Sequence, residues 1–385
     1  MASPPLLMIP GPIEISESVR AAAAGPPPSH TSAGLIAAFG NALRAMREVW
    51  RADASSQPFV IAGSGTLAME TAAANLVEPG DRVLVVKTGY FSDRMVEILR
   101  RYGAEVTEIR AEVGDSPTVE QVAAALAAGG AWKALFATHV DTSTAVRIDA
   151  EPLARLAAEH GALAVFDGVC ATAGERFEMA QWGADVYFTA SQKAIGLPPG
   201  LALTVASERA LAARQSRTAP PPPLYLDWLS WLPIHRAYEE GKPSYFATPA
   251  TSLVRALEAG LTEILTEGVE ARWEAHQRAA DAMRAAWASL GLPSVARGTL
   301  AANTLSALTL PPGLKPADVV SKAAAQGVLL AGGLHPAIRD TSIRVGHMGV
   351  VVHRPADLER TVRAVASAVG GDAEAAVAAF RRHAP

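Results

Sequence analysis

The sequence predicts an α/β fold, because short apolar runs of strand character alternate with helical runs rich in Ala, Leu, Arg and Glu up to Ser207. The chain has 385 residues, of which 50% are hydrophobic and 19% charged, so it can form two cores and is not disordered. Such alternation indicates βαβ units and a mostly parallel sheet with helices on both faces. We expect strands at 59–62, 83–87, 105–110, 134–139, 163–167, 186–190 and 201–206, with helices at 66–76, 92–102, 118–128 and 152–160 between them.

After Ser207 the alternation stops, and a proline-rich segment with large aromatic side chains follows at 218–231. One interpretation is a flexible linker. The size of the apolar side chains favours a packed segment instead, for example at a dimer interface. The side chains concerned are Tyr225, Leu226, Trp228 and Trp231.

The rest of the chain predicts a smaller C-terminal α/β domain. A long amphipathic helix is expected at 251–290 with a break near Gly268, because glycine is a poor helix former. Strand patterns return at 305–310 and 342–345, with helices at 315–326 and 356–369. We therefore divide the chain into an N-terminal segment (1–15), a large domain (16–262) and a small domain (263–385).

Composition excludes several classes of function. The net charge is −4 and the basic residues are scattered, so we expect neither nucleic acid nor a membrane as a partner. The single cysteine, Cys170, permits no intrachain disulfide, and we expect no metal site. The N-terminus has no basic region followed by an apolar stretch, and no run of 18 apolar residues occurs. We expect a soluble, cytoplasmic protein.

A lysine and an aspartate at two strand ends carry the chemistry. The strand at 186–190 runs into Ser-Gln-Lys193 and then Pro-Pro-Gly, which confines the lysine. Confinement favours the neutral amine that forms Schiff bases. Asp167 ends another strand, and such a pair is typical of a pyridoxal phosphate (PLP) site, where the aspartate binds the pyridinium nitrogen. Taken singly, Asp167 could cap a turn and Lys193 could be a surface residue.

A glycine-containing turn, Gly63-Ser-Gly-Thr66, lies between an expected strand and an expected helix. Its N–H groups and the positive end of the helix favour a phosphate group. The same residues also fit the dinucleotide-binding pattern G-x-G-x-x-A. That fold usually ends its second strand in an acidic residue, whereas here the second strand ends in Lys87. The order of phosphate loop, aspartate and lysine favours PLP, with the dinucleotide alternative left open.

These motifs, together with Met8-Ile-Pro-Gly-Pro12 and Arg344-Val-Gly-His-Met-Gly349, resemble the fold-type I PLP enzymes of aminotransferase class V. More narrowly, the chain resembles the alanine/serine–glyoxylate (pyruvate) aminotransferases over nearly its whole length. The resemblance implies a mostly parallel seven-stranded sheet in the large domain and a homodimer with shared active sites. It also implies a ping-pong transfer of the amino group from alanine or serine to glyoxylate or pyruvate.

The resemblance assigns a role to each matching residue. Lys193 and Asp167 are the catalytic residues, Arg344 binds the substrate carboxylate, and Gly11 lies beside the substrate. Phe91 and Val169 pack against the two faces of the cofactor ring, and Thr142 supplies a nearby hydroxyl. The phosphate is bound by Ser64, Gly65, Thr66 and Gln192, joined by Tyr245 and Thr248 of the neighbouring subunit.

The chain departs from the family pattern near the substrate. The segment Asp141-Thr-Ser-Thr-Ala145 replaces Glu-Ser-Ser/Thr-Gly, and Asp167-Gly-Val-Cys-Ala replaces Asp-Ala-Val-Ser-Ser. Cys170 is interpreted as a small residue packed behind the cofactor, and the extra Arg147 and Arg339 either favour a dianionic substrate or are solvated. The alternatives are therefore a phosphonate, ureidoglycine or pyridoxamine aminotransferase, or a dimeric binding protein that kept the fold. A cysteine desulfurase is disfavoured, since it needs its cysteine on a loop toward the C-terminal domain.

Overall fold

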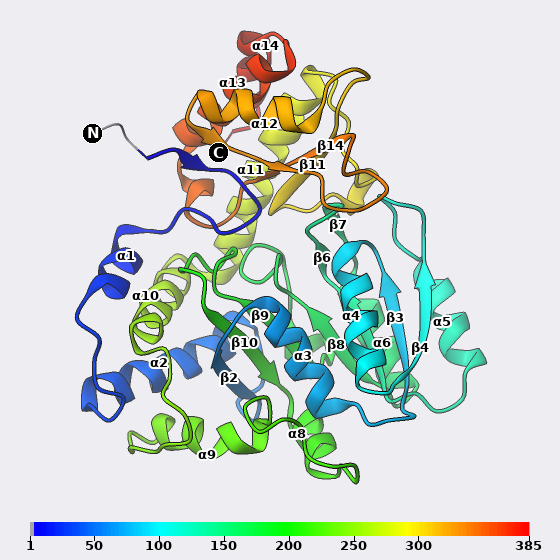
Figure 1. The fold of residues 1–385 in the computed structure, drawn as a ribbon, viewed down its shortest axis with the longest axis vertical. Coiled ribbons are helices and arrows are strands. Elements are labelled where there is room, and N and C mark those ends of the chain that lie inside the picture. Colours follow the sequence, from blue (N-terminus) through cyan, green and yellow to red (C-terminus); the bar gives the residue numbers. More distant parts are fainter. Residues whose placement is uncertain (1–3, 385) are drawn as a thin grey trace.

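The large domain contains the seven strands that the sequence predicts, in a computed structural model that describes residues 4–384. They are β2 (Gln57–Ala62), β3 (Arg82–Lys87), β4 (Glu105–Arg110), β5 (Ala134–Thr138), β8 (Leu163–Asp167), β9 (Val186–Ala190) and β10 (Leu201–Ala206). Their order in the sheet is β2-β10-β9-β8-β5-β3-β4 (Figure 1). Only β10 runs antiparallel to its neighbours, so the prediction of a mostly parallel α/β fold is confirmed.

Helices cover both faces of this sheet, as the βαβ pattern requires. One face is covered by α2 (Ala33–Val49), α5 (Val119–Ala128), α6 (Ala150–Glu159) and α10 (Thr251–Glu267). The other face is covered by α3 (Gly65–Leu76), α4 (Tyr90–Arg101) and α8 (Glu208–Gln215). Two helices near the N-terminus, α2 and α1 (Glu17–Ala24), were not among the predicted elements.

The proline-rich segment at 218–231 is only partly a connector. Its last residues begin α9 (Trp228–Glu239), a helix that the sequence pattern does not predict because Pro233 lies inside it. The Trp228 ring stacks on Phe59 at 5.4 Å, so the chain's own core covers it. Trp231 and Leu226 are also buried, whereas Tyr225 remains 38% exposed.

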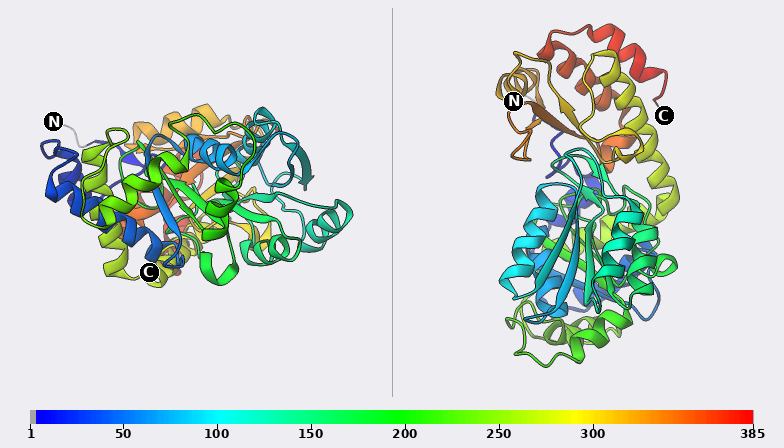
Figure 2. Two further views of the ribbon diagram at one scale, coloured as in Figure 1. Left: turned by 90° about the horizontal axis from the view of Figure 1, so that it is seen from below. Right: turned by 90° about the vertical axis from the view of Figure 1, so that its right-hand side faces the viewer.

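The C-terminal part has its own sheet and core. The expected break at Gly268 separates α10 from α11 (Val269–Ser289), and this glycine has a φ of 91°. The sheet has the order β11-β14-β13, and the small domain lies at one end of the large domain (Figures 1 and 2). Its elements are β11 (Leu305–Thr309), α12 (Pro316–Ala325), β13 (Ala331–Gly332), β14 (Ser342–Gly346), α13 (Pro355–Val369) and α14 (Ala373–Arg381). The division at residues 262 and 263 stays a prediction, since α11 contributes side chains to both cores.

The N-terminal segment connects the two domains. Its strand β1 (Leu6–Leu7) pairs in parallel with β12 (Val328–Leu329) of the small domain, and the chain then passes into α1 of the large domain (Figure 1). Short strands β6 (Val140–Asp141) and β7 (Val146–Arg147) form a hairpin after β5. None of the helices within residues 4–384 is long and apolar enough to cross a membrane.

The register of the sheet brings the chemical residues together. Asp167, at the end of β8, lies opposite Thr138 of β5 and Phe188 of β9. Because β9 runs parallel to β8, the chain leaves β9 on the same edge of the sheet and continues into Lys193. The candidate site therefore lies at the carboxyl ends of the parallel strands, where ligands bind in open α/β sheets.

Candidate active site

Lys193 lies in the turn that follows β9 and is partly buried. Its Nζ donates a hydrogen bond to the carbonyl of Pro10. Burial lowers the pKa of this amine, and the positive charge of Arg344 lowers it further, against the opposing effects of Cys170 and Asp167. The surroundings therefore favour the neutral, nucleophilic form of the amine.

Asp167 is buried at the end of β8, and its Oδ1 accepts a hydrogen bond of 2.8 Å from the N–H of Val169. Burial, with a smaller contribution from the carboxylate of Asp141, raises the pKa of Asp167 to about 7. Lys193 and Arg94 oppose this shift from a distance, but neither forms a direct ion pair with the carboxyl group. A protonated ring nitrogen placed beside it would provide that partner.

The predicted phosphate loop is open at the N-terminus of α3. Ser64 and Thr66 are exposed, and the Ser64 side chain makes no hydrogen bond that caps the helix. Gly65 is packed so tightly that a Cβ would lie 2.9 Å from Cγ2 of Val169, which places the loop directly against the residue predicted to contact the ring. The helix N–H groups at this end are the usual donors to a phosphate group.

Gln192 supports the same location. Its Oε1 is buried and has no hydrogen-bond partner among the described residues. A buried polar atom without a hydrogen-bond partner destabilises the folded protein. The unpaired Oε1 therefore indicates that a bound ligand supplies the missing hydrogen bond. The loop at Ser64–Thr66, with the tightly packed Gly65, and the amide of Gln192 are therefore consistent with a site for the phosphate group of PLP.

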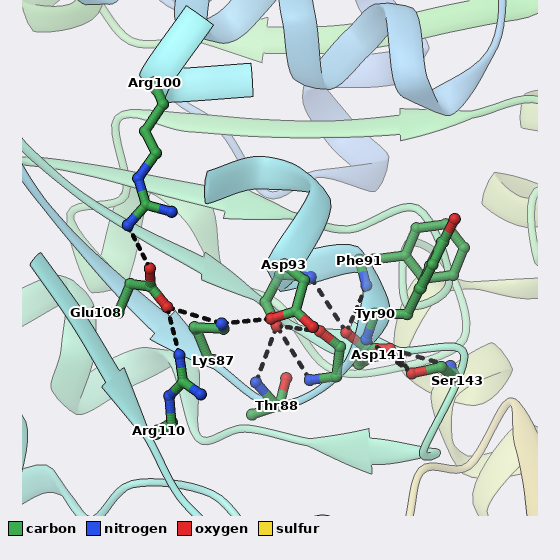
Figure 3. Close-up of polar contacts among 12 residues, drawn as sticks. Lys87, Thr88, Tyr90, Phe91, Asp93, Arg100, Glu108, Arg110, Asp141 and Ser143 are labelled. Carbon is green, nitrogen blue, oxygen red and sulfur yellow. Dashed lines mark hydrogen bonds and ion pairs between the residues drawn. The ribbon is translucent and has the colours of Figure 1, made fainter. Parts of the chain in front are cut away.

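The backbone of Phe91 is fixed by Asp141, a residue that the sequence analysis did not assign to the site. Oδ2 of Asp141 accepts hydrogen bonds from the N–H groups of Phe91 (3.0 Å) and Ser92 (3.3 Å), and Oδ1 accepts one from the Ser143 hydroxyl (2.6 Å; Figure 3). A Cβ on Gly89 would lie 2.5 Å from Cγ of Asp141, so glycine is required there. The signal in the sequence was an acidic residue immediately before Thr142, in a strand-end segment.

Arg344 projects from β14 of the small domain toward the large domain. Its Nε donates to the carbonyl of Gly332 (2.9 Å) and its Nη1 to the carbonyl of Thr142 (3.4 Å). Both acceptors are neutral, so the positive charge is not compensated by these contacts. An anionic substrate group would satisfy it with the bidentate geometry that guanidinium and carboxylate favour.

The structure does not bring two predicted residues to the site of this chain. Tyr245 is 63% exposed and its ring lies 5.3 Å from that of His30, while Thr248 is also exposed. The hydroxyl of Tyr238 lies within hydrogen-bonding distance of the carbonyls of His30 and Ser244, so the two loops form one surface. An exposed aromatic residue of this size is consistent with contact to another chain.

The structure also places the residues at which the chain departs from the family pattern. Cys170 is buried, and burial raises the pKa of its thiol, which is the environment of an unreactive cysteine. Arg147 pairs with buried Glu175 (3.1 Å), and Arg339 lies on the surface beside Asp340 (3.7 Å). At Ala145, where the family has glycine, φ is 59°, the left-handed conformation that glycine adopts most readily.

Comparison with known proteins agrees with this geometry. The profile of the family "Aminotransferase class-V" matches residues 20–365. The chain is 39% identical over 357 residues to alanine–glyoxylate aminotransferase 1 of Saccharomyces cerevisiae, covering 89% of this chain and 92% of that one. It is 32% identical to L-aspartate–glyoxylate aminotransferase of Paracoccus denitrificans, covering 91% and 87%. The crystal structure of alanine–glyoxylate aminotransferase from Nostoc sp. superposes with a TM-score of 0.89 at 28% identity, covering 96% of both chains.

The matched residues include the predicted phosphate loop together with Asp167, Lys193 and Arg344. Membership of an aminotransferase family rules out the dinucleotide-binding and non-catalytic alternatives. The partly buried Lys193 and the buried Asp167 at adjoining strand ends are consistent with PLP chemistry. The chain belongs to the class V aminotransferases, and it is a PLP-dependent transaminase.

Proposed function

We propose that this transaminase moves the amino group of a small neutral amino acid, alanine or serine, to glyoxylate or pyruvate. The relatives named alanine–glyoxylate and serine–glyoxylate aminotransferases support this assignment. The observation that carries the choice of donor is the pairing of Arg147 with Glu175. With that charge neutralised and Arg339 on the surface, Arg344 is left to bind the α-carboxylate, and no second cation is assigned to a side-chain carboxylate.

Each side chain of the site has a separate role in the proposed reaction. Arg344 would hold the α-carboxylate and so orient the Cα–H bond toward Lys193. The neutral Nζ of Lys193 would take the Cα proton and hold it. Asp167 would accept a hydrogen bond from the protonated ring nitrogen, while Phe91 and Val169 hold the ring. PLP, when bound, supplies the electron sink that stabilises the carbanion left at Cα.

We propose further that the enzyme is a homodimer in which each site uses Tyr245 and Thr248 of the neighbouring subunit. The exposure of Tyr245 supports this proposal. The hydroxyl groups of Tyr245 and Thr248 could donate hydrogen bonds to the phosphate at the open side of the predicted phosphate loop, where Ser64 and Thr66 are exposed. A second subunit would cover both surfaces at once.

The competing donors are aspartate, pyridoxamine, ureidoglycine and aminophosphonates. Initial rates with glyoxylate should separate these substrates from alanine and serine. We expect kcat/KM for alanine or serine to exceed that for aspartate at least tenfold, because aspartate would leave a carboxylate unpaired. Equal or higher values for aspartate would contradict the proposed donor.

A further inference from the structure

Arg94 lies between the predicted phosphate loop and Phe91, which is predicted to pack against the cofactor ring. It projects from the first turns of α4, and its Nη1 donates a hydrogen bond of 3.1 Å to Oγ1 of Thr66. Its guanidinium carbon lies 5.3 Å from the centre of the Phe91 ring and 5.0 Å from that of Tyr90. Its Nη2 donates to the Tyr90 hydroxyl at 2.9 Å. One side chain therefore touches both the phosphate loop and the aromatic pair whose rings Figure 3 draws.

No carboxylate among residues 4–384 pairs directly with Arg94, although its charge lowers the pKa of Asp167. The other arginines of this helix are paired, Arg100 with Glu108 (2.6 Å) and Arg101 with Glu97 (2.6 Å). Arg94 instead contacts two hydroxyls and two ring faces, all of them neutral. A half-buried guanidinium held in this way can still accept an anion.

The anion that the site receives is the phosphate of PLP, which carries close to two negative charges at neutral pH. The helix α3 supplies about half a positive charge at its N-terminus. The carboxylate of Asp141 lies close enough to Asp167 to raise its pKa, so the site already holds two acidic groups. Lys193 and Arg344 are assigned to the aldehyde and the substrate. Among residues 4–384, Arg94 is a further cation, and it contacts the predicted phosphate loop through Thr66.

We propose that Arg94 is a positioning residue for the cofactor, which supplies positive charge to the phosphate and holds Thr66 and the Phe91 ring in place. Its hydrogen bond to Oγ1 leaves the hydroxyl hydrogen of Thr66 free to donate to a phosphate oxygen. The cation over the Phe91 ring fixes the orientation of that ring. The inference rests on the PLP assignment but not on the donor or the acceptor.

The test compares two ligands, PLP and pyridoxal, which share the aldehyde and the ring but differ in the phosphate. Binding of each to the cofactor-free protein is measured by absorbance titration without substrate, so the result does not depend on which amino acid the enzyme uses. We expect Arg94→Gln to weaken PLP binding by roughly 10- to 100-fold, the range of a lost charge-assisted hydrogen bond. Pyridoxal lacks the phosphate and loses only the effect of Arg94 on the Phe91 ring, so its binding should weaken by no more than about threefold.

Three variants complete the test. Arg94→Lys keeps the charge and should recover most of the preference for PLP over pyridoxal. Arg101→Gln removes an exposed, paired arginine from the same helix and should leave both affinities unchanged. If Arg94→Gln does not fold, Tyr90→Phe removes the hydroxyl that holds Nη2 and should lower PLP affinity a few-fold, with a smaller effect on pyridoxal. An equal loss of PLP and pyridoxal, or no loss of PLP, would overturn the inference.

Discussion

Gly11 and Lys193 are packed so closely that a Cβ at Gly11 would lie 2.7 Å from Cδ and 2.8 Å from Nζ of the lysine. Gly11 has a φ of +123°, which side chains other than glycine's hydrogen rarely allow. The neighbouring carbonyl of Pro10 accepts the hydrogen bond from Nζ. The N-terminal segment, which begins on the small domain, therefore sets the position of the lysine in the large domain.

The first prediction is that Gly11→Ala impairs the reaction while leaving the fold intact. The added methyl group would displace the Lys193 amine, and a displacement of about 1 Å can cost roughly 100-fold in rate. We expect kcat to fall by about that factor, with an unchanged circular dichroism spectrum. Gly34→Ala is the matched control, because a Cβ there meets no atom within 4 Å, and it should retain wild-type kcat. Wild-type kcat in Gly11→Ala would show that the close packing does not matter.

The second prediction concerns Asp167→Asn. The neutral amide cannot hold a proton on the ring nitrogen, so we expect kcat to fall by about 100-fold or more. Steady-state kinetics with saturating PLP measure this loss. Activity within a few-fold of the wild type would contradict the role assigned to this carboxyl group.

The same substitution should change how the stability of the cofactor-free protein depends on pH. Burial raises the pKa of Asp167 to about 7, whereas an unfolded aspartate titrates near 4. The folded state thus binds more protons than the unfolded state between about pH 4 and 7, and stability falls as pH rises through this range. Asparagine does not titrate, so the variant does not lose this stability. The free energy of unfolding of Asp167→Asn minus that of the wild type should be on the order of 2 kcal/mol greater at pH 8 than at pH 5. Urea unfolding at the two pH values measures it, and equal differences would contradict the raised pKa.

The third prediction tests the shared site. Lys193→Ala and Tyr245→Ala chains should each form weakly active or inactive homodimers. A mixed dimer would contain one site with both residues intact and one site lacking both. Equal co-expression should therefore restore about a quarter of the wild-type activity, since half of the dimers are mixed. If Tyr245 acted within its own chain, mixing would restore nothing.

The fourth prediction tests whether Arg147 stabilises the fold by pairing with Glu175 or binds the substrate. Arg147→Gln leaves the buried Glu175 without its cation, so we expect a loss of about 2 kcal/mol in the free energy of unfolding. Glu175→Gln in the same chain should recover much of this loss. The ratio of kcat/KM for alanine and aspartate should not change in either variant. A selective change in aspartate turnover would instead assign Arg147 to the substrate.

The sequence predicts the strands of the large domain well because their apolar runs are short, buried and bounded by polar turns. It also predicts the helix break at Gly268, which a single glycine encodes. Helix α9 is not predicted, because Pro233 and several bulky aromatic residues are poor local signals for a helix that tertiary packing stabilises. A local sequence pattern therefore predicts an element only where residues within that element determine its structure.

The site divides in the same way. Lys193, Asp167 and the phosphate loop lie in contiguous motifs, so their order along the chain reveals them. Asp141 and Arg94 act through contacts with residues about 50 and 28 positions away, and no local pattern marks such contacts. The role of Tyr245 depends on a second subunit and stays a prediction.

The most direct test of the proposed reaction is the absorption spectrum of the purified protein with PLP, recorded before and after addition of L-alanine and then of glyoxylate. We expect a visible band of the bound cofactor that alanine abolishes and glyoxylate restores, because each half-reaction proceeds alone. A band that alanine does not change would contradict the proposed donor. A protein that forms no band with PLP would contradict the site built around Lys193.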